Sequence, residues 1–178
     1  GSLWSFGSIE KMIDVSFYRS DRQDASIAFT AAKPMAALYA VEHLPGVLRA
    51  EPYRAVSVKI GAGHVYRRLS LMGKPRQSDL SRVLDEELRP VAMPETGVML
   101  TKALAEILGV GSGDRVRVEL LEGDRRVMEL PVSAVVEGYL GLMAFMDIDA
   151  LNRALREGAM ISGVHLSIDP LRQKDLFA

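Results

Sequence analysis

Strict alternation of apolar residues with other residues, in stretches far apart along the chain, is the feature that most limits the possible folds. Neighbouring side chains of a β-strand point to opposite faces, so a period of two predicts a strand with one buried face. The clearest stretches are Arg54–Ile60, Arg115–Leu121 and Val164–Ile168. Several such strands must pair in a sheet, because an isolated strand leaves its backbone hydrogen-bonding groups unsatisfied.

Apolar residues spaced by three or four predict helices between these strands. Each predicted helix has its own start or stop signal: Met35–Leu44 after Pro34 and before Pro45-Gly46, Lys102–Leu108 between Thr101 and Gly109, and Ile148–Glu157 between Asp147 and Gly158. A short helix is also expected over Asp79–Leu88, and an amphipathic helix over Leu3–Ile13. The chain is therefore expected to mix helices with a predominantly antiparallel, hairpin-rich sheet.

Composition excludes several classes of protein. The chain has 178 residues, 22 Lys+Arg against 23 Asp+Glu, a formal net charge of −1 and no Cys. It is too apolar and too balanced in charge to be disordered, and it has no basic surplus to drive nucleic-acid binding. Without Cys there is no Cys-ligated zinc, iron–sulfur cluster or thiol nucleophile. The sequence contains no apolar run of about 20 residues, and no signal peptide is expected.

No arrangement of residues in the sequence indicates catalysis. His43, His64 and His165 do not stand at metal-ligand spacing with another His, Asp or Glu. No Gly-x-Ser-x-Gly or Gly-x-x-x-x-Gly-Lys motif occurs. Gly109–Asp114 resembles a phosphate loop, but it follows a helix and precedes a strand, the reverse of the order that phosphate binding needs, so a helix stop and a turn are favoured. We expect no catalytic residue, no cofactor and no metal.

Three clusters allow a binding interpretation beside a structural one. Asp85-Glu86-Glu87 could hold a cation, although a solvated helix end is favoured. Met143 and Met146 flank Phe145 and could form an adaptable binding face, although core packing is favoured. A local basic patch could meet anionic lipid or a partner, although a solvated hairpin face is favoured; its residues are Lys59, Arg67, Arg68, Lys74 and Arg76.

The segment Gly97–Gly109, followed by Gly113–Val116, resembles the extracytoplasmic domain of FtsX-like and MacB-like ABC transporter permeases. In those domains an apolar strand leads into a Ser/Thr-capped helix that ends in Leu-Gly, and Gly-Asp opens the next strand. Further segments resemble one branch of large permeases in the same order: Met12–Val15, Leu44–Val47, Glu51–Arg54, Tyr139–Gly141, Phe145–Asp147 and Leu151–Asn152. The resemblance covers nearly the whole chain.

The resemblance implies an α+β fold, in which a strand–helix–strand unit of ferredoxin-like or porter-like type carries a smaller inserted β-rich subdomain. Residues 1–24 are then a membrane-proximal stalk helix and linker, and residues 25–178 are the extracytoplasmic domain. Within it, residues 25–97 and 138–178 form mainly the α+β unit, and residues 98–137 form the smaller subdomain.

The resemblance also implies a function. The chain is expected to be a soluble domain on the periplasmic side of the bacterial inner membrane, anchored by flanking membrane helices that this chain lacks. Its expected partners are the cognate ABC ATPase, reached through the rest of the permease, and a second permease copy or homologue. Lipoprotein release, efflux and control of cell-wall hydrolases all remain open as outcomes of the ATP-driven motion that such domains relay.

A second hypothesis is of a different class. Gly113-Asp114 followed by alternating strands also occurs in small β-barrels of double-psi type. The chain is then a free-standing small-molecule-binding barrel or an enzyme accessory domain. Apolar runs on both sides of this segment in the full-length protein favour the first hypothesis, and a soluble full-length chain favours the second.

Overall fold

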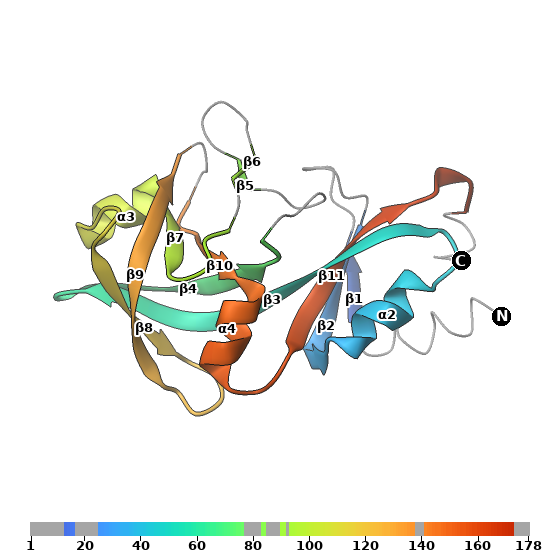
Figure 1. Ribbon diagram of the computed structural model, residues 1–178, viewed down its shortest axis with the longest axis horizontal. Helices are drawn as coiled ribbons and strands as arrows, with labels where there is room; N and C mark the ends of the chain where they lie inside the picture. Colours follow the sequence, from blue (N-terminus) through green and yellow to red (C-terminus); the bar gives the residue numbers. More distant parts are fainter. Residues whose placement is uncertain are drawn as a thin grey trace. The chain divides into compact units, whose positions relative to one another are not determined.

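The computed structural model describes two compact units of the chain (Figure 1). The described residues are 13–16, 25–76, 83–84, 90–91, 93–137 and 141–172. Those of unit 1 are 13–16, 25–54 and 157–172, and the remainder belong to unit 2. Unit 2 is therefore inserted, in chain order, between two parts of unit 1. Among the described residues, no helix is long and apolar enough to cross a bilayer.

Unit 1 is an antiparallel sheet in the order β1–β2–β11–β3. It is built from β1 (Ile13–Ser16), β2 (Ala25–Pro34), α2 (Ala36–Glu42), the first half of β3 (Val47–Ala62), β11 (Met160–Ile168) and the short 3-10 turn Pro170–Arg172. Because β11 lies between β2 and β3 and is antiparallel to both, β2 and β3 run in the same direction on either side of α2 in the sequence. In chain order these elements are β2, α2 and β3.

Unit 2 closes its sheet. Six strands follow one another in the order β3–β4–β10–β7–β9–β8, and β8 pairs back onto β3. The strands that follow β3 in this unit are β4 (Val65–Lys74), β7 (Val98–Thr101), β8 (Arg115–Leu120), β9 (Val127–Val136) and β10 (Ala144–Asp147). The helices are α3 (Lys102–Leu108) and α4 (Ile148–Leu155), and a separate small ladder joins β5 (Val83–Leu84) to β6 (Pro90–Val91). The β4–β10 and β7–β9 pairs are parallel.

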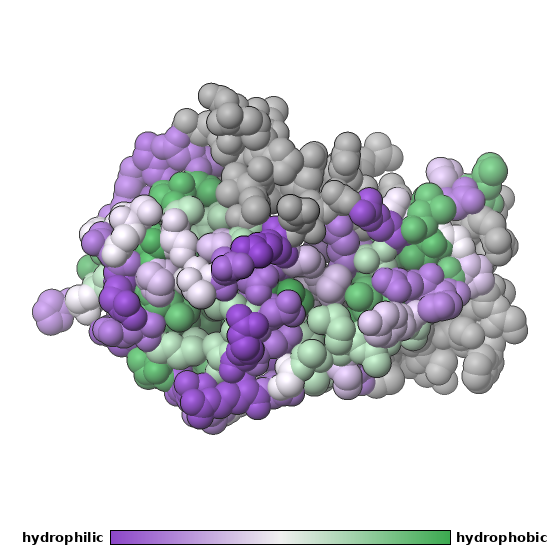
Figure 2. All heavy atoms as spheres, in the orientation of Figure 1, coloured by the Kyte–Doolittle hydropathy of each residue, from purple (hydrophilic) through white to green (hydrophobic). Residues whose placement is uncertain are grey.

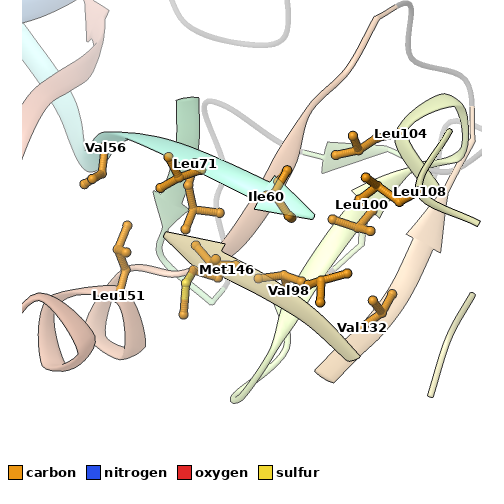
Figure 3. Close-up of a cluster of buried hydrophobic side chains, with 14 of the residues drawn as sticks. Val56, Ile60, Leu71, Val98, Leu100, Leu104, Leu108, Val132, Met146 and Leu151 are labelled. Carbon is orange, nitrogen blue, oxygen red and sulfur yellow. The ribbon is translucent and has the colours of Figure 1, made fainter. Parts of the chain in front are cut away.

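Apolar side chains fill the interior of this closed sheet (Figure 3). Val58, Ile60 and Leu100 are fully buried there, and the alternating residues of β8 supply Val118 and Leu120. Leu104 and Leu108 of α3, and Leu151 of α4, pack onto the same cluster. The period-two interpretation of Arg54–Ile60 and Arg115–Leu121 is confirmed, since every second residue enters one core.

The helix termini agree with the sequence in position and differ in detail. Asp147 caps α4, because its Oδ2 accepts a hydrogen bond from the Ala150 amide at 3.0 Å. Gly109 ends α3 with a left-handed φ of 69°. Thr101 stands at the N-cap of α3, but its side chain makes no capping hydrogen bond. The left-handed C-cap of α4 is Arg156, with φ 58°, instead of Gly158.

Two local predictions are wrong because strand pairing competes with helical spacing. Ile13, which the predicted N-terminal helix includes, lies in β1 and pairs with Phe29. Val83–Leu84, in the predicted helix Asp79–Leu88, pairs with Pro90–Val91. Residues 1–12 and 17–24 of the stalk, the cluster Asp85-Glu86-Glu87, Tyr139-Leu140 and the chain after Arg172 lie outside the described residues.

The inserted unit is wider than the subdomain expected over residues 98–137. Residues 55–76 and 141–156 lie in it as well. The physical reason is pairing: β3 is hydrogen-bonded to β8, and β10 to β7, so these segments share one sheet and one core with residues 98–137. The chain thus forms a mixed, sheet-dominated fold with three α-helices among its described residues.

Candidate functional site

The three histidines have separate environments. His43 is exposed, and its Nδ1 lies 2.5 Å from the backbone oxygen of Tyr39. His64 is exposed in the turn between β3 and β4. His165 lies on β11 and is half-buried. Within the part of the chain that the structure describes, no group of three or more His, Asp or Glu side chains could hold a metal ion.

His165 belongs to a polar row across the sheet of unit 1. Its register partners are Ser26 on β2 and Glu51 on β3. The Ser26 hydroxyl lies 2.7 Å from His165 Nδ1, and the Tyr53 ring stacks on the imidazole with centroids 4.6 Å apart. Ser26 is only 5% exposed, so its hydroxyl is not presented to a substrate as a nucleophile would be. The row pairs buried polar groups with one another, as an interior requires.

The sequence analysis did not predict this row, because Ser26 and His165 are 139 residues apart in the chain. The available signal was that every second residue of β2 is small or polar, as are Gly163, His165 and Ser167 at the same spacing on β11. Directly opposed residues of antiparallel strands share a face, so polar positions on both strands can meet.

The Gly109–Asp114 segment is a helix stop and a turn, as the sequence favoured. The Gly111 amide donates to Asp114 Oδ2 at 2.8 Å, and the Asp114 amide donates to the Gly111 oxygen at 3.1 Å. Since Asp114 accepts a hydrogen bond from the Gly111 amide within the turn, the loop offers a carboxylate instead of a set of free amides. It is not suited to phosphate.

Phe145 and Met146 fill the core, which confirms the favoured interpretation. They are 1% and 2% exposed. Met143 is partly buried against the cluster that contains Phe145, Met93 and Met99. These methionines are therefore packing residues of unit 2.

The structure divides the predicted basic patch. Lys74 is 8% exposed, and its Nζ lies 5.7 Å from the Phe145 ring centroid. Arg76 pairs with Glu95 at 2.6 Å. Lys59, Arg67 and Arg68 stay together on the hairpin formed by β3 and β4.

A fourth cation, which the sequence analysis did not group with them, joins these three. Arg117 on β8 is the register partner of Gly61 on β3, and its guanidinium donates to the Gly63 oxygen at 3.4 Å. Lys59 Nζ lies 4.0 Å from the centroid of the Tyr66 ring, a cation–π contact. We call Lys59, Tyr66, Arg67, Arg68 and Arg117 the hairpin surface. Its signal in the sequence was period-two spacing, which puts Arg117 and Glu119 on the face opposite Val116 and Val118.

The hairpin surface combines exposed apolar and charged side chains. Val65 is 39% exposed and Tyr66 47%, and both arginines of β4 are exposed. Figure 2 shows hydrophilic residues beside paler and apolar ones at the left-hand end, where the β3–β4 hairpin ends in Figure 1. An aromatic ring among guanidinium and ammonium groups is suited to binding an anionic partner.

The chain has the fold of domains from ABC transporters. It is similar to the extracellular domain of the ABC-type transporter YknZ from Gram-positive bacteria, with a TM-score of 0.57 and 14% identity over 93% of this chain and 88% of that one. It is also similar to the periplasmic region of MacB from Actinobacillus actinomycetemcomitans, with a TM-score of 0.52 and 13% identity over 80% of this chain and 70% of that one. No protein-family model matches the sequence, and no curated protein matches it significantly. The MacB-like resemblance is therefore confirmed at the level of the fold.

Proposed function

We propose that this chain, which has the fold of extracytoplasmic domains of ABC transporters, is itself the extracytoplasmic domain of a bacterial permease of that kind. It relays ATP-driven motion of the permease to a substrate or partner protein outside the cytoplasmic membrane. The single observation that carries the proposal is the fold, which matches the YknZ domain over 93% of this chain.

The proposed assembly follows from this role. A cognate ABC ATPase supplies the energy from the cytoplasmic side, and a second permease copy or homologue completes the transporter. Residues 1–24, of which β1 (Ile13–Ser16) pairs into the sheet of unit 1, are the proposed membrane-proximal part of the domain. Unit 1 is the ferredoxin-like or porter-like part of the domain, and lipoprotein release, efflux and hydrolase control are its candidate outcomes.

The closed sheet of unit 2 bears on the alternative, a free-standing barrel that binds a small molecule. A barrel of few strands holds a ligand only where its interior is not filled by its own side chains. Here Val58, Ile60 and Leu100 occupy that interior with no exposed area. A ligand of unit 2 therefore has to bind outside the barrel, which favours the role of an interaction domain.

The test is to locate the domain in cells that express the full-length protein. Since this chain has no Cys, a single introduced Cys gives labelling with no background from this segment. Thr30→Cys in unit 1 and Ser112→Cys in unit 2 introduce thiols at exposed positions. We expect a membrane-impermeant maleimide to label both variants in intact cells.

The same variants in lysed cells are the control, because they show that each thiol is reactive. Labelling only after lysis would place the domain inside the cytoplasm and would overturn the proposal. Recovery of the full-length protein in the soluble fraction, without membrane, would favour the free-standing barrel.

The proposal assigns no catalytic step to this chain. We expect no turnover of ATP or of ester, peptide and glycan substrates by the purified domain. Turnover that one substitution in the chain abolishes would refute this part of the proposal while leaving the location of the domain untouched.

A further inference from the structure

One edge of β4 has no partner strand over the residues nearest the hairpin turn. On one side β4 pairs with β3, and on the other β10 pairs only with Leu71–Lys74. Among the described residues, no strand pairs with the second side of Val65–Ser70. Unpaired amides and carbonyls on a strand edge form a template for a further strand.

The turn geometry identifies which backbone groups face outward. Gly63 has a φ of 61° and His64 has no positive φ, a combination that fits a two-residue type II′ turn between Ala62 and Val65. The residues that flank such a turn form a hydrogen-bonded pair, and bonding then alternates along the strand. The amides of Val65 and Arg67 therefore point to β3, and those of Tyr66 and Arg68 point to the open edge.

The two faces of this edge differ in chemistry. Leu69 packs against the barrel core, so Val65 and Arg67 lie on its face, which is largely apolar. Tyr66 and Arg68 lie on the other face, beside Lys59. A strand added here fits best when it directs acidic side chains to the Arg68 face and apolar side chains to the Val65 face. Alternation of the two kinds along the added strand satisfies both.

Within unit 2, the β3–β4 hairpin itself carries only positive charge, while two acidic residues lie on neighbouring strands: Glu119 is the register partner of Lys59, and Glu129 is that of Arg117. No Asp or Glu occurs between Glu51 and Asp79. Lys59, Arg67, Arg68 and Arg117 form no salt bridge with another described residue. Four cations around an open strand edge raise the local concentration of an acidic segment and add charge-assisted hydrogen bonds once it is bound.

Other occupants fit less well. Charged side chains on an edge can serve only to prevent aggregation, but an edge with that role alone gains nothing from Tyr66 at 47% exposure. A second copy that pairs through this edge brings like charges into opposition, which is unfavourable. Anionic lipid headgroups can meet the arginines and accept from outward amides, yet they offer no backbone donors for the outward carbonyls of the same edge.

We propose that Val65–Ser70 of β4, with Lys59 and Arg117 beside it, binds an extended segment of a partner protein in which acidic and apolar residues alternate, as an added β-strand. The mode is β-augmentation, in which main-chain hydrogen bonds supply affinity and alternate side chains supply specificity. The proposal deepens the proposed function by giving the chemistry of an extracytoplasmic partner, and it rests on that function only for where the partner is met.

The experiment uses the chain itself and a synthetic probe, a short peptide of alternating valine and glutamate. We expect saturable binding by calorimetry that weakens as ionic strength rises. The amides of Tyr66 and Arg68 should gain protection from hydrogen exchange when the peptide is bound. The matched peptide of alternating valine and lysine should not bind.

Two sets of variants separate charge from strand addition. Reversal of both charges in R67E/R68E should lower the affinity by about tenfold or more, since the ion pair at Arg68 becomes a repulsive contact and the reversed charge at Arg67 repels the acidic peptide as a whole. The control R115E/R153E makes the same change in net charge at exposed residues outside the hairpin surface, and it should retain binding. R68A and R68P lose the same charge, but only R68P loses the outward amide, so R68P should bind more weakly than R68A. Proline is tolerated where the amide of an edge strand faces solvent.

Several outcomes would overturn the proposal. Equal binding by R68A and R68P, or no added protection at Tyr66 and Arg68, would mean charge attraction without strand addition. Binding to phosphatidylglycerol vesicles but not to the peptide would make the surface a lipid contact, and concentration-dependent dimerisation through β4 would make it a self-interface. If neither the peptide nor the vesicles bound, the charged side chains of this edge would serve only to prevent aggregation. None of these results alters where the domain lies in cells, so failure here is distinct from failure of the proposed function.

Discussion

Unit 1 contains an open sheet, whereas the sheet of unit 2 closes on itself. The described strands of unit 1 form an open sheet with a polar row, Ser26, His165 and Tyr53, on one face. The strands of unit 2 close on themselves around an apolar interior that includes Leu71 and Leu100, both without exposed area. A closed sheet removes most edges, so the stretch of β4 that stays unpaired is conspicuous. The comparison shows that the apolar cluster of unit 2 lies inside a closed sheet, whereas the sheet of unit 1 carries a polar row on one face.

The largest effect should come from removing packing inside the barrel. Leu100→Ala should lower the free energy of unfolding by about 2–5 kcal/mol, because it leaves a cavity where no exposed area existed. Urea denaturation measures the loss. Val127→Ala is the control, since Val127 is 56% exposed on β9 and should change stability by less than about 0.5 kcal/mol. A small effect at Leu100 would mean that the barrel interior can collapse around a void.

A smaller effect is expected in the polar row of unit 1. A Cβ at Gly163 would overlap the backbone oxygen of Ile27 and the ring of Tyr53. Gly163→Ala should therefore destabilise the protein by about 1–3 kcal/mol through overpacking, and it should displace Tyr53 from its stack on His165. Thermal unfolding and the His165 ring resonances report the two consequences.

Gly111→Ala is the matched control for Gly163→Ala. A Cβ at Gly111 meets nothing within 4 Å, and the residue has no positive φ. Its substitution should change stability by no more than about 0.5 kcal/mol. Equal effects at the two glycines would argue against close packing of Tyr53 over Gly163.

The cap of α4 should matter less than either core. Asp147→Ala removes the hydrogen bond to the Ala150 amide and should cost about 1 kcal/mol. Asp147→Asn is the control, because Asn caps helices about as well as Asp does. If both variants lost the same stability in urea, the carboxylate would be acting through its charge instead of as a cap.

The smallest changes in stability should come from breaking two ion pairs, which differ in how far they are exposed. Glu157 pairs at 3.1 Å with Arg54, whose side chain is 7% exposed, and Glu157→Ala should cost about 0.5–1 kcal/mol because Glu157 itself is 40% exposed. Glu95, 71% exposed, pairs with Arg76, 57% exposed, in unit 2, so Glu95→Ala should change stability by less than about 0.5 kcal/mol. Chemical denaturation of both variants, at low and high salt, tests the order.

The sequence by itself determined the local elements that one apolar face defines. Val56, Val58 and Ile60 alternate and are buried, and Val116, Val118 and Leu120 do the same. Asp147 capped α4, and Gly109 ended α3, because these residues act on backbone groups within one helical turn. The resemblance to transporter domains rested on short residue motifs such as Gly97–Gly109 and Gly113–Val116, and the general fold was expected from that resemblance.

Only the tertiary structure decided which groups meet across the fold. Thr101 has a capping residue's chemistry, yet its hydroxyl donates to the Gly141 oxygen at 3.1 Å and accepts from the Met143 amide at 3.2 Å. Val83–Leu84 pairs as a strand although the surrounding spacing favours a helix. Lys74 lies against the Phe145 ring and not in the predicted basic patch, and Arg117 lies near Lys59 on the hairpin surface. The physical reason is that a residue's type does not encode its pairing partner, so the neighbours of Thr101, Lys74 and Arg117 are set only once the strands of unit 2 pair.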